Sequence, residues 1–395
     1  MILNLREGIK AFYVNGMLRS LVIAVVGIFT PVFVYRLGLM QYGEIRYGVM
    51  TVAIYYLITR LTTLIGVIPV SNLIEKIGFR KSILISIFLL AANLALLIAA
   101  ENNFWLLIIG GISSGINIPF YWLARNSAIS QDGDKRHVGS QMGWMTTFEQ
   151  IAAMLGPLSA GLIIEKWGFA TLYILSLLIL IVSVVPLFVM PPHVHKNGAT
   201  LRGFWYFVTN RRYFHNGVGI GARAVDDYSI NVLWPLSIFV MGIKVGVIGG
   251  IFSLVSLAAL LTRLVVSRVF DKLHARRDWS DEIIFALSAI GSAVLWPIRL
   301  FLTGVSSILA VDLVGAVFGT AYSNIYINYE QLGGMRMGNI AYWVYGEMMY
   351  SLMTIFLMGM VVVAAYFSVW REVVFLSASF WLLISTVMAR ESNMR

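Results

Sequence analysis

Charged and polar side chains recur at helical spacing inside stretches that are otherwise apolar, and these are the residues that could do chemistry. The segment 214–241 carries one stripe at spacings of 4, 4 and 3 residues: Arg223, Asp227, Asn231 and Trp234. Asp226 lies beside it. Desolvation disfavours the charged form of a carboxylic acid, so Asp226 or Asp227 can exchange a proton in the working pH range while Arg223 and Arg19 poise it. The stripe therefore predicts a cavity wall that binds ions or protons, with a plain Arg223–Asp227 ion pair as the simpler alternative.

Other apolar segments also present polar residues one helical turn apart. The candidates for substrate binding are Asn15, Arg19, Tyr56, Arg60, Asn117, Tyr121, Arg223, Asn231 and Trp234. The candidates for proton coupling are Asp226, Asp227, Glu149 and Glu347. Each charge at a bilayer centre costs about 2.5 to 3.5 kcal/mol on insertion scales, so each needs a partner or water. We expect Arg263, Arg299 and Asp312, nearer the ends of their segments, to reach the membrane interface instead.

The composition places these residues in a membrane. Apolar residues make up 59% of the 395 and charged residues only 12%, with a mean hydropathy of +0.82, whereas soluble domains are about a quarter charged. The net charge of +10 comes from bases scattered over short loops, which argues against a nucleic-acid partner. The absence of cysteine excludes disulfides and thiolate metal sites. We expect no cofactor, no metal and no catalytic residue.

Twelve apolar segments are long enough to cross a bilayer, which takes roughly 20 helical residues because backbone amides cannot stay unpaired in hydrocarbon. They are 12–36, 46–70, 81–100, 104–126, 141–164, 170–190, 214–241, 247–270, 282–302, 306–328, 339–366 and 372–390. The longest connection is central and begins with Pro191-Pro192. The sequence thus predicts an all-α membrane protein with an N-terminal six-helix lobe (1–192), a cytoplasmic linker (193–213) and a C-terminal six-helix lobe (214–395).

The lysines and arginines of the loops predict the orientation. With a cytoplasmic N-terminus, 19 of the 29 bases lie on the cytoplasmic side and six on the opposite side, while four lie within helices. We therefore expect both termini in the cytoplasm.

Two internal repeats indicate that a six-helix unit was duplicated. Residues 71–81 and 267–277 carry matching acids and bases at a constant offset of 196. The first segments of the two halves agree at an offset of 204, which pairs Arg19 with Arg223, Pro31 with Pro235, and Gly38 with Gly242. We expect two lobes related by pseudo-symmetry.

The first repeat resembles the signature of the major facilitator superfamily. Its residues are Ser71, Glu75, Lys76, Gly78, Arg80 and Lys81, with Ser in place of the usual Gly and Glu in place of Asp. The second copy contains Asp271, Lys272, Arg276 and Arg277. The resemblance covers the whole chain, and it implies that superfamily's twelve-helix fold and a charged latch between the lobes on the cytoplasmic side. Plain positive-inside topology is the alternative, but it does not explain the repeated acid.

The segment 141–164 resembles a motif of small residues associated with exporters of the antiporter type. The matching positions are Gly143, Ala152, Gly156, Pro157, Ala160 and Gly161, two of them alanine where the motif has glycine. Small residues let helices approach closely, and proline bends a helix. Gly143, Gly156, Pro157 and Gly161 are therefore the predicted hinge, with generic helix packing as the alternative. The superfamily's R-x-x-Q-G pattern lacks its arginine here, where Leu106 and Ile109 precede Gly110.

We therefore predict a secondary transporter that works by alternating access around a site between two lobes. The leading hypothesis is proton-coupled export of a small amphipathic organic compound. The alternatives are uptake of a polar nutrient or organic anion, flipping of a lipid or lipid-linked molecule and, more remotely, an intramembrane enzyme. The predicted partners are a small-molecule substrate, protons and membrane lipids. We expect a multi-pass protein that functions as a monomer in the cytoplasmic (inner) membrane of a prokaryote.

Overall fold

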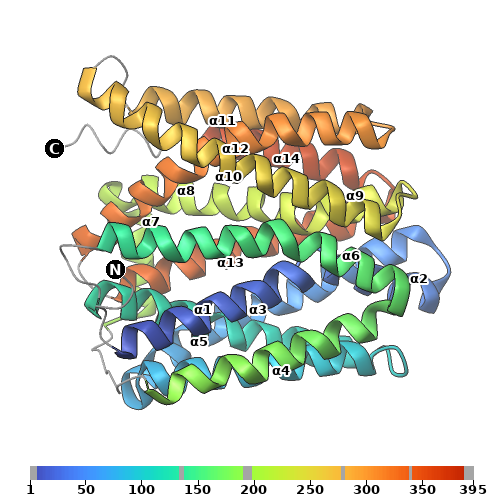
Figure 1. Ribbon diagram of the computed structural model, residues 1–395, viewed down its shortest axis with the longest axis horizontal. Helices are drawn as coiled ribbons and strands as arrows, with labels where there is room; N and C mark the ends of the chain where they lie inside the picture. The colour runs from blue at the N-terminus through green and yellow to red at the C-terminus, as the bar shows by residue number, and fades with distance from the viewer. Residues whose placement is uncertain (1–6, 133–137, 190–197, 277–280, 338–339, 387–395) are drawn as a thin grey trace.

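The protein is a bundle of helices that run roughly along one axis (Figure 1). The computed structural model describes residues 7–132, 138–189, 198–276, 281–337 and 340–386, and these residues contain no β-strand. The α-helices are α1 (Glu7–Val26), α2 (Thr30–Tyr42), α3 (Ile45–Ile77), α4 (Phe79–Ala99), α5 (Leu106–Asp132), α6 (Val138–Val184), α7 (Leu201–Thr209), α8 (Arg211–Tyr228), α9 (Trp234–Val240), α10 (Val245–Arg276), α11 (Asp281–Ile298), α12 (Val305–Met337), α13 (Ile340–Tyr366) and α14 (Trp370–Ser385). The π-helical turn η3 (Ser229–Leu233) joins α8 to α9, and the 3-10 turns η2 (Val185–Val189) and η4 (Arg299–Phe301) follow α6 and α11.

These helices account for the twelve predicted membrane crossings. Nine described spans are long and apolar enough to cross a bilayer, the first of them made of α1 and α2 together. The span over residues 149–189 bends at Gly168, whose φ of 84° interrupts the helix, and so supplies two crossings. The remaining two are the interrupted helix α8–η3–α9 and α14. The predicted all-α fold is confirmed.

The first crossing of each half is broken at the same place. The chain turns before α2, which has Pro31 in its first turn, and the π-helical turn precedes α9, which has Pro235 in its first turn. Proline suits a helix start because the amide that it lacks would have no helical partner there. The pairing of Pro31 with Pro235 is confirmed.

The pairing of Gly38 with Gly242 was wrong. Gly242 follows α9 with a φ of 87°, and the glycine in the same conformation after α2 is Gly43, with a φ of 77°. Gly38 lies inside α2, where a Cβ would collide with Thr51. The register shifts because α2 has 13 residues and α9 only 7.

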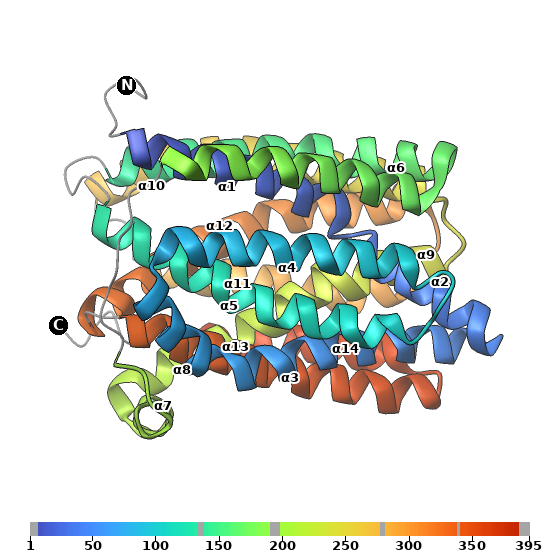
Figure 2. The ribbon, with the colours of Figure 1, turned by 90° about the horizontal axis from the view of Figure 1, so that it is seen from below.

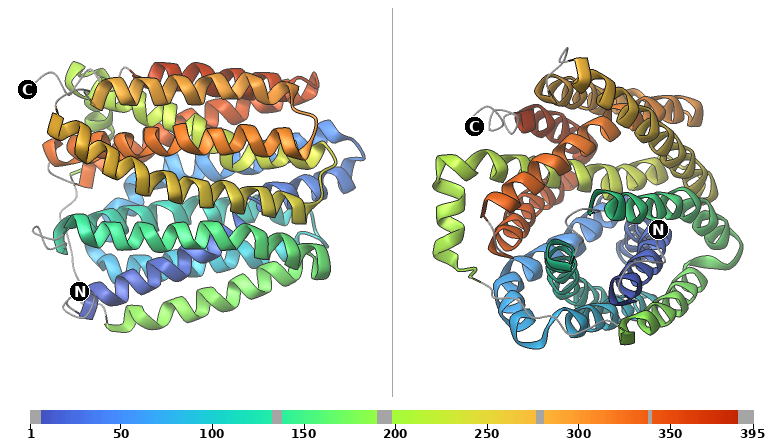
Figure 3. Two further views of the ribbon diagram at one scale, coloured as in Figure 1. Left: turned by 45° about the horizontal axis from the view of Figure 1, so that its top comes forward. Right: turned by 60° about the vertical axis from the view of Figure 1, so that its left-hand side comes forward.

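The helices pack within each half and along long seams between the halves. In the first half α1 contacts α6, and α5 contacts α3 and α4; in the second half α8 contacts α13 and α14, and α11 contacts α12 and α14. Between the halves, α3 packs against α13, α2 meets α9, and α6 lies beside α10 (Figure 3). The six-helix arrangement of each half follows the predicted pseudo-symmetry, while the exact lobe boundaries stay a prediction.

Glycine sets the distance between α6 and α10. A Cβ at Gly249 of α10 would collide with the carbonyl oxygen of Pro157 in α6. Next to this contact, the Leu158 amide donates to the Ser253 hydroxyl at 2.9 Å. The two helices therefore meet backbone to backbone, as small residues allow in membranes.

The described part of the predicted linker contains the short helix α7, which lies crosswise to the other helices at the end where α1 begins (Figure 2). Thr200 caps α7, since its hydroxyl oxygen accepts a hydrogen bond from the Gly203 amide at 3.0 Å. Phe207 is fully buried against Tyr345 of α13, while Trp205 is 68% exposed. An apolar face on such a helix suits a position along a membrane surface.

Candidate functional site

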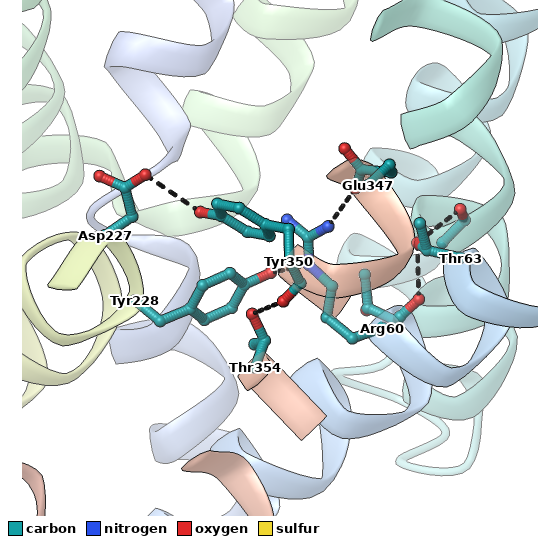
Figure 4. A network of polar contacts seen from close by, with 9 residues as sticks. Arg60, Thr63, Asp227, Tyr228, Glu347, Tyr350 and Thr354 are labelled. Atoms are coloured by element: carbon teal, nitrogen blue, oxygen red, sulfur yellow. Dashed lines mark hydrogen bonds and ion pairs between the residues drawn. The ribbon is translucent and has the colours of Figure 1, made fainter. Parts of the chain in front are cut away.

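An arginine of α3 joins the two halves of the molecule (Figure 4). Arg60 Nη1 lies 2.6 Å from Glu347 Oε1 on α13, and Arg60 Nε donates to the Tyr228 hydroxyl on α8 at 2.6 Å. The side chains of Arg60 and Glu347 are only 10% and 16% exposed. A buried ion pair is a poor stabiliser compared with apolar packing, so its position between the halves points to function.

The contacts continue from Arg60 to α8 through a second tyrosine. The Arg60 guanidinium lies 4.6 Å from the ring centre of Tyr350, whose hydroxyl donates to Asp227 Oδ2 at 3.2 Å (Figure 4). Asp227 is also paired with Arg223, at 2.9 Å. Charged groups and tyrosine rings thus alternate from α3 to α8.

The break in the seventh crossing positions these acids. The π-helical turn begins directly after Tyr228, and such turns are frequent at functional sites. Asn231, inside the turn, donates its side-chain amide to the backbone carbonyl of Asp227 at 2.9 Å. Asp226 has a different partner, the indole N–H of Trp296, at 3.2 Å. Arg223 and Asn231, the neighbours of Asp227 in the predicted stripe, therefore both contact Asp227, and Asp226 lies beside the stripe.

A second polar cluster lies inside the C-terminal half. Arg299 contacts Asp312 Oδ1 through Nε and Nη2, at 3.2 and 2.9 Å, and the two side chains are 5% and 4% exposed. The fully buried Trp234 donates its indole N–H to Asp312 at 2.8 Å. The prediction that Arg299 and Asp312 reach the interface was wrong, because each supplies the counter-charge that lets the other stay buried. Trp234 belongs to this cluster and is separate from the Arg60 network.

The N-terminal half has its own buried charges. Arg19 on α1 is 4% exposed, donates to Asn117 Oδ1 at 3.1 Å and lies 3.8 Å above the ring centre of Tyr121. Arg125, one turn beyond Tyr121 on α5, pairs with Glu149 of α6 at 2.8 Å. Four predicted residues therefore lie in this region: Arg19, Asn117, Tyr121 and Glu149.

The other two predicted substrate residues have different surroundings. Tyr56 joins the cross-lobe network, since its ring packs edge-on against Tyr228 with 5.6 Å between ring centres. Asn15 is 1% exposed and donates to the Ser183 carbonyl at 2.6 Å, where α1 packs on α6.

The predicted latch begins at the end of α3. Gly78, between α3 and α4, has a φ of 80°, a conformation that glycine adopts at no steric cost. Ser71 is buried, and its hydroxyl donates to the Ile68 carbonyl at 2.7 Å. Glu75 and Arg80 are half-buried, and Lys76 and Lys81 are exposed.

The second copy of the latch lies outside the residues whose side chains the structure describes. This holds for Asp271, Lys272 and Arg276, which fall in the last part of α10, and for Arg277, which lies beyond it. The latch therefore stays a prediction.

The predicted hinge residues of α6 face two neighbours. A Cβ at Gly156 would lie 2.9 Å from the Cβ of Ala24 on α1, and one at Gly161 would lie 3.1 Å from the Cα of Gly246 on α10. The surroundings of Gly143 lie outside the described residues. The small-residue stripe thus packs α6 against both halves.

The sequence pattern did not single out Tyr350 or Arg125. Both stood at helical spacing from predicted residues, Tyr350 three residues after Glu347 and Arg125 four after Tyr121. A tyrosine in an apolar segment more often packs against other side chains than binds a ligand. Arg125 stands next to residue 126, the expected end of its helix. Only the contacts across helices distinguish them.

The assembled groups can recognise charged and aromatic compounds. Arginine presents a planar fork of donors to carboxylates and phosphates, and tyrosine faces accept apolar or cationic groups. In the described part of the chain, no group of three or more histidines or acids is placed to hold a metal ion.

The sequence model of the Major Facilitator Superfamily matches residues 11–358, nearly the whole chain. The chain belongs to the Major Facilitator Superfamily. It is therefore a multi-pass membrane transporter of small molecules and not an enzyme. The chain is 24% identical over 164 residues to the MFS-type transporter SLC18B1 of Mus musculus, a match that spans 40% of this chain and 35% of the mouse protein.

Solved structures of transporters share the fold at low sequence identity. A D-xylose–proton symporter superposes with a TM-score of 0.70 at 11% identity and 97% coverage of each chain. A bacterial metal transporter gives a TM-score of 0.65 at 15% identity, with 98% of this chain and 99% of that chain covered. The E. coli fucose:proton symporter gives 0.62 at 14% identity, with 97% and 98% covered.

Proposed function

We propose that this transporter couples the export of a small amphipathic organic compound to proton entry across the cytoplasmic membrane of a prokaryote. Both termini lie in the cytoplasm in this proposal, and the chain works as a monomer. The lobes 1–192 and 214–395, joined by the linker 193–213, alternate access around the region between them.

The cross-lobe network of Arg60 carries the proposal. It contains Arg60 and Arg223 with the acids Asp227 and Glu347, and Asp226, the neighbour of Asp227 in the chain, adds a third carboxylate. The acids therefore outnumber the arginines by one, which leaves a net negative charge. One bound proton would cancel this charge, and burial favours the neutral state because desolvation penalises an unbalanced charge. Protonation of Glu347 removes its attraction to Arg60, which holds α3 to α13, and protonation of Asp227 weakens its contacts with Arg223 on α8 and Tyr350 on α13. Proton binding and separation of the lobes are then linked.

The chemistry of the same region supports an amphipathic substrate. Tyr228 and Tyr350 present their rings to the Arg60 guanidinium, and Tyr56 packs edge-on against Tyr228. Such aromatic faces suit the apolar part of a compound. Charged groups beside them suit a polar head. The direction of transport rests on the small-residue motif of α6, which resembles that of antiporters.

The latch residues complete the proposed cycle. Glu75 and Asp271, with the bases around them, hold the lobes together on the cytoplasmic side when the transporter opens outward. The hinge at Gly143, Gly156, Pro157 and Gly161 bends as the lobes rock.

Proton coupling is tested in proteoliposomes with the variants Asp226→Asn and Asp227→Asn. The probes are octanesulfonate, octyltrimethylammonium and octyl glucoside, none of which carries a titratable proton. We expect each variant to reduce pH-driven transport to the level of empty liposomes, because a neutral amide cannot cycle a proton. Substrate exchange at equal pH should persist.

The matched control is Glu44→Gln, which alters an exposed acid on the turn before α3. It should transport as the unmodified protein does. Undiminished pH-driven transport in both aspartate variants would contradict proton coupling through these acids, and the direction of accumulation distinguishes export from uptake.

A further inference from the structure

The two halves of the transporter hold an arginine at the same place. Arg19 and Arg223 lie in the first crossing of each half, the same number of residues before Pro31 and Pro235. Each guanidinium lies over tyrosine on the fourth crossing of its own half. Arg19 is 3.8 Å from the ring centre of Tyr121, and Arg223 is 5.9 and 5.7 Å from those of Tyr322 and Tyr326.

The two arginines differ in their counter-charge. Arg223 is paired with Asp227 one turn along the helix, at 2.9 Å. With the offset of 204 residues between the two halves, the residues of α1 that correspond to Asp226 and Asp227 are Val22 and Ile23. The N-terminal arginine therefore lacks the carboxylate that its counterpart carries.

No other acid replaces it within the part of the chain that the structure describes. Arg19 is 4% exposed and has one hydrogen-bond acceptor, Asn117, while its Nη1 is buried without a partner. The acid of this region, Glu149, lies 2.8 Å from Arg125 and accepts from the Ser20 hydroxyl at 3.5 Å. Glu149 therefore pairs with Arg125 and not with Arg19.

We propose that Arg19 binds an anionic oxygen group of the transported compound, a carboxylate, sulfonate or phosphate, at the place that Asp227 takes beside Arg223. The ring of Tyr121 backs the guanidinium and Asn117 holds one of its nitrogens, which leaves Nη1 to donate to the ligand. The proposal rests on the central transport site proposed above and specifies the charge of its substrate.

Access to Arg19 follows from the transport cycle. The guanidinium is enclosed in the described conformation, so the anion enters when the lobes separate. A compound with an apolar chain and an anionic head would place the head on Arg19 and the chain against the tyrosines near Arg60.

Binding is measured at equilibrium on purified protein in a neutral detergent, at one pH and without a gradient. Octanesulfonate and octyl phosphate are compared with octyltrimethylammonium by calorimetry and by the shift in melting temperature. We expect the two anions to bind and the cation not to bind. Arg19→Gln should weaken anion binding at least tenfold. Arg46→Gln, which alters a half-buried arginine near the α3 start, should leave it unchanged.

A second variant keeps Arg19 in place. Ile23→Asp supplies the missing acid one turn away, so it should also weaken anion binding at least tenfold, while Ile23→Asn should not.

Without ligand, the Arg19→Gln variant should have a melting temperature no lower than that of the unmodified protein, because the substitution removes a buried charge that has no acid partner. If Arg19 were purely structural, its replacement would instead lower the melting temperature of the protein.

The outcomes separate this inference from proton coupling. Unchanged anion binding in both Arg19→Gln and Ile23→Asp would overturn the inference. Stabilisation by phosphatidylglycerol in nanodiscs without any response to octanesulfonate or octyl phosphate would also overturn it, since Arg19 would then hold a lipid. Anion binding that persists in Asp227→Asn supports it even if pH-driven transport fails.

Discussion

At the scale of single residues, the buried charges of this transporter fall into neutralised and unneutralised groups. Arg299 and Asp312 neutralise each other with almost no exposure, whereas Arg19 has no acid partner among the described residues. Removing one member of a neutral pair leaves an uncompensated charge, but removing an unpaired charge relieves one. Stability measurements therefore distinguish structural arginines from functional ones.

The Arg299–Asp312 pair should be structural. We expect Arg299→Met and Asp312→Leu each to cost about 3–5 kcal/mol of folding free energy, because each leaves the other charge buried and unpaired. The double variant should recover most of this loss. Denaturant titration in detergent checks the prediction, with Glu44→Gln as the surface control, which should change stability by under about 1 kcal/mol. Single variants as stable as the unmodified protein would show that the pair is dispensable.

At the scale of elements, the seam between α6 and α10 depends on backbone contact. Gly249 leaves no room for a Cβ beside Pro157, whereas a Cβ on the adjacent Gly250 would meet no atom within 4 Å. A side chain is therefore excluded at Gly249 but has room at Gly250.

This difference gives a matched pair of variants. Gly249→Val should force α6 and α10 apart, and overpacking costs about 1–3 kcal/mol. The conformation closed at this seam should therefore lose about 5- to 150-fold in population. Gly250→Val should behave as the unmodified protein. Because the chain has no cysteine, paired spin labels can be introduced without background, and their distance distribution across the seam reports the result. Equal distributions for the two variants would contradict a role for the close contact.

At the scale of the whole molecule, Arg60 ties three helices from both halves. It contacts Glu347 on α13 and Tyr228 on α8, and it lies over Tyr350. The described conformation is therefore held by charge at its centre as well as by the glycine seam.

Loss of the Arg60 contacts should shift the balance away from the described conformation. We expect Arg60→Gln to broaden spin-label distances between α3 and α13, since the amide cannot pair with Glu347 and leaves that acid uncompensated. Tyr228→Phe, which removes one hydrogen bond, should have a smaller effect. Distances that stay as narrow in Arg60→Gln as in the unmodified protein would show that the pair does not hold the lobes.

The sequence by itself determined the membrane class, the number of crossings and the repeated halves. Hydrocarbon forces every backbone amide into a helix, so apolar length alone counts the crossings. It also predicted the Arg223–Asp227 pair, because residues four apart meet on one helix face whatever the rest of the fold does. The breaks before Pro31 and Pro235 follow from the same local rules.

Only the tertiary structure decided which distant groups meet. Arg60 lies 168 residues from Tyr228 and 287 from Glu347, and no local spacing records such pairs. The burial of Arg299 with Asp312 and the isolation of Arg19 were likewise invisible, because a charge in an apolar segment looks the same in sequence whether its partner is an acid, water or a ligand. Helix periodicity fixes neighbours within a turn, whereas partners across helices depend on how the lobes dock.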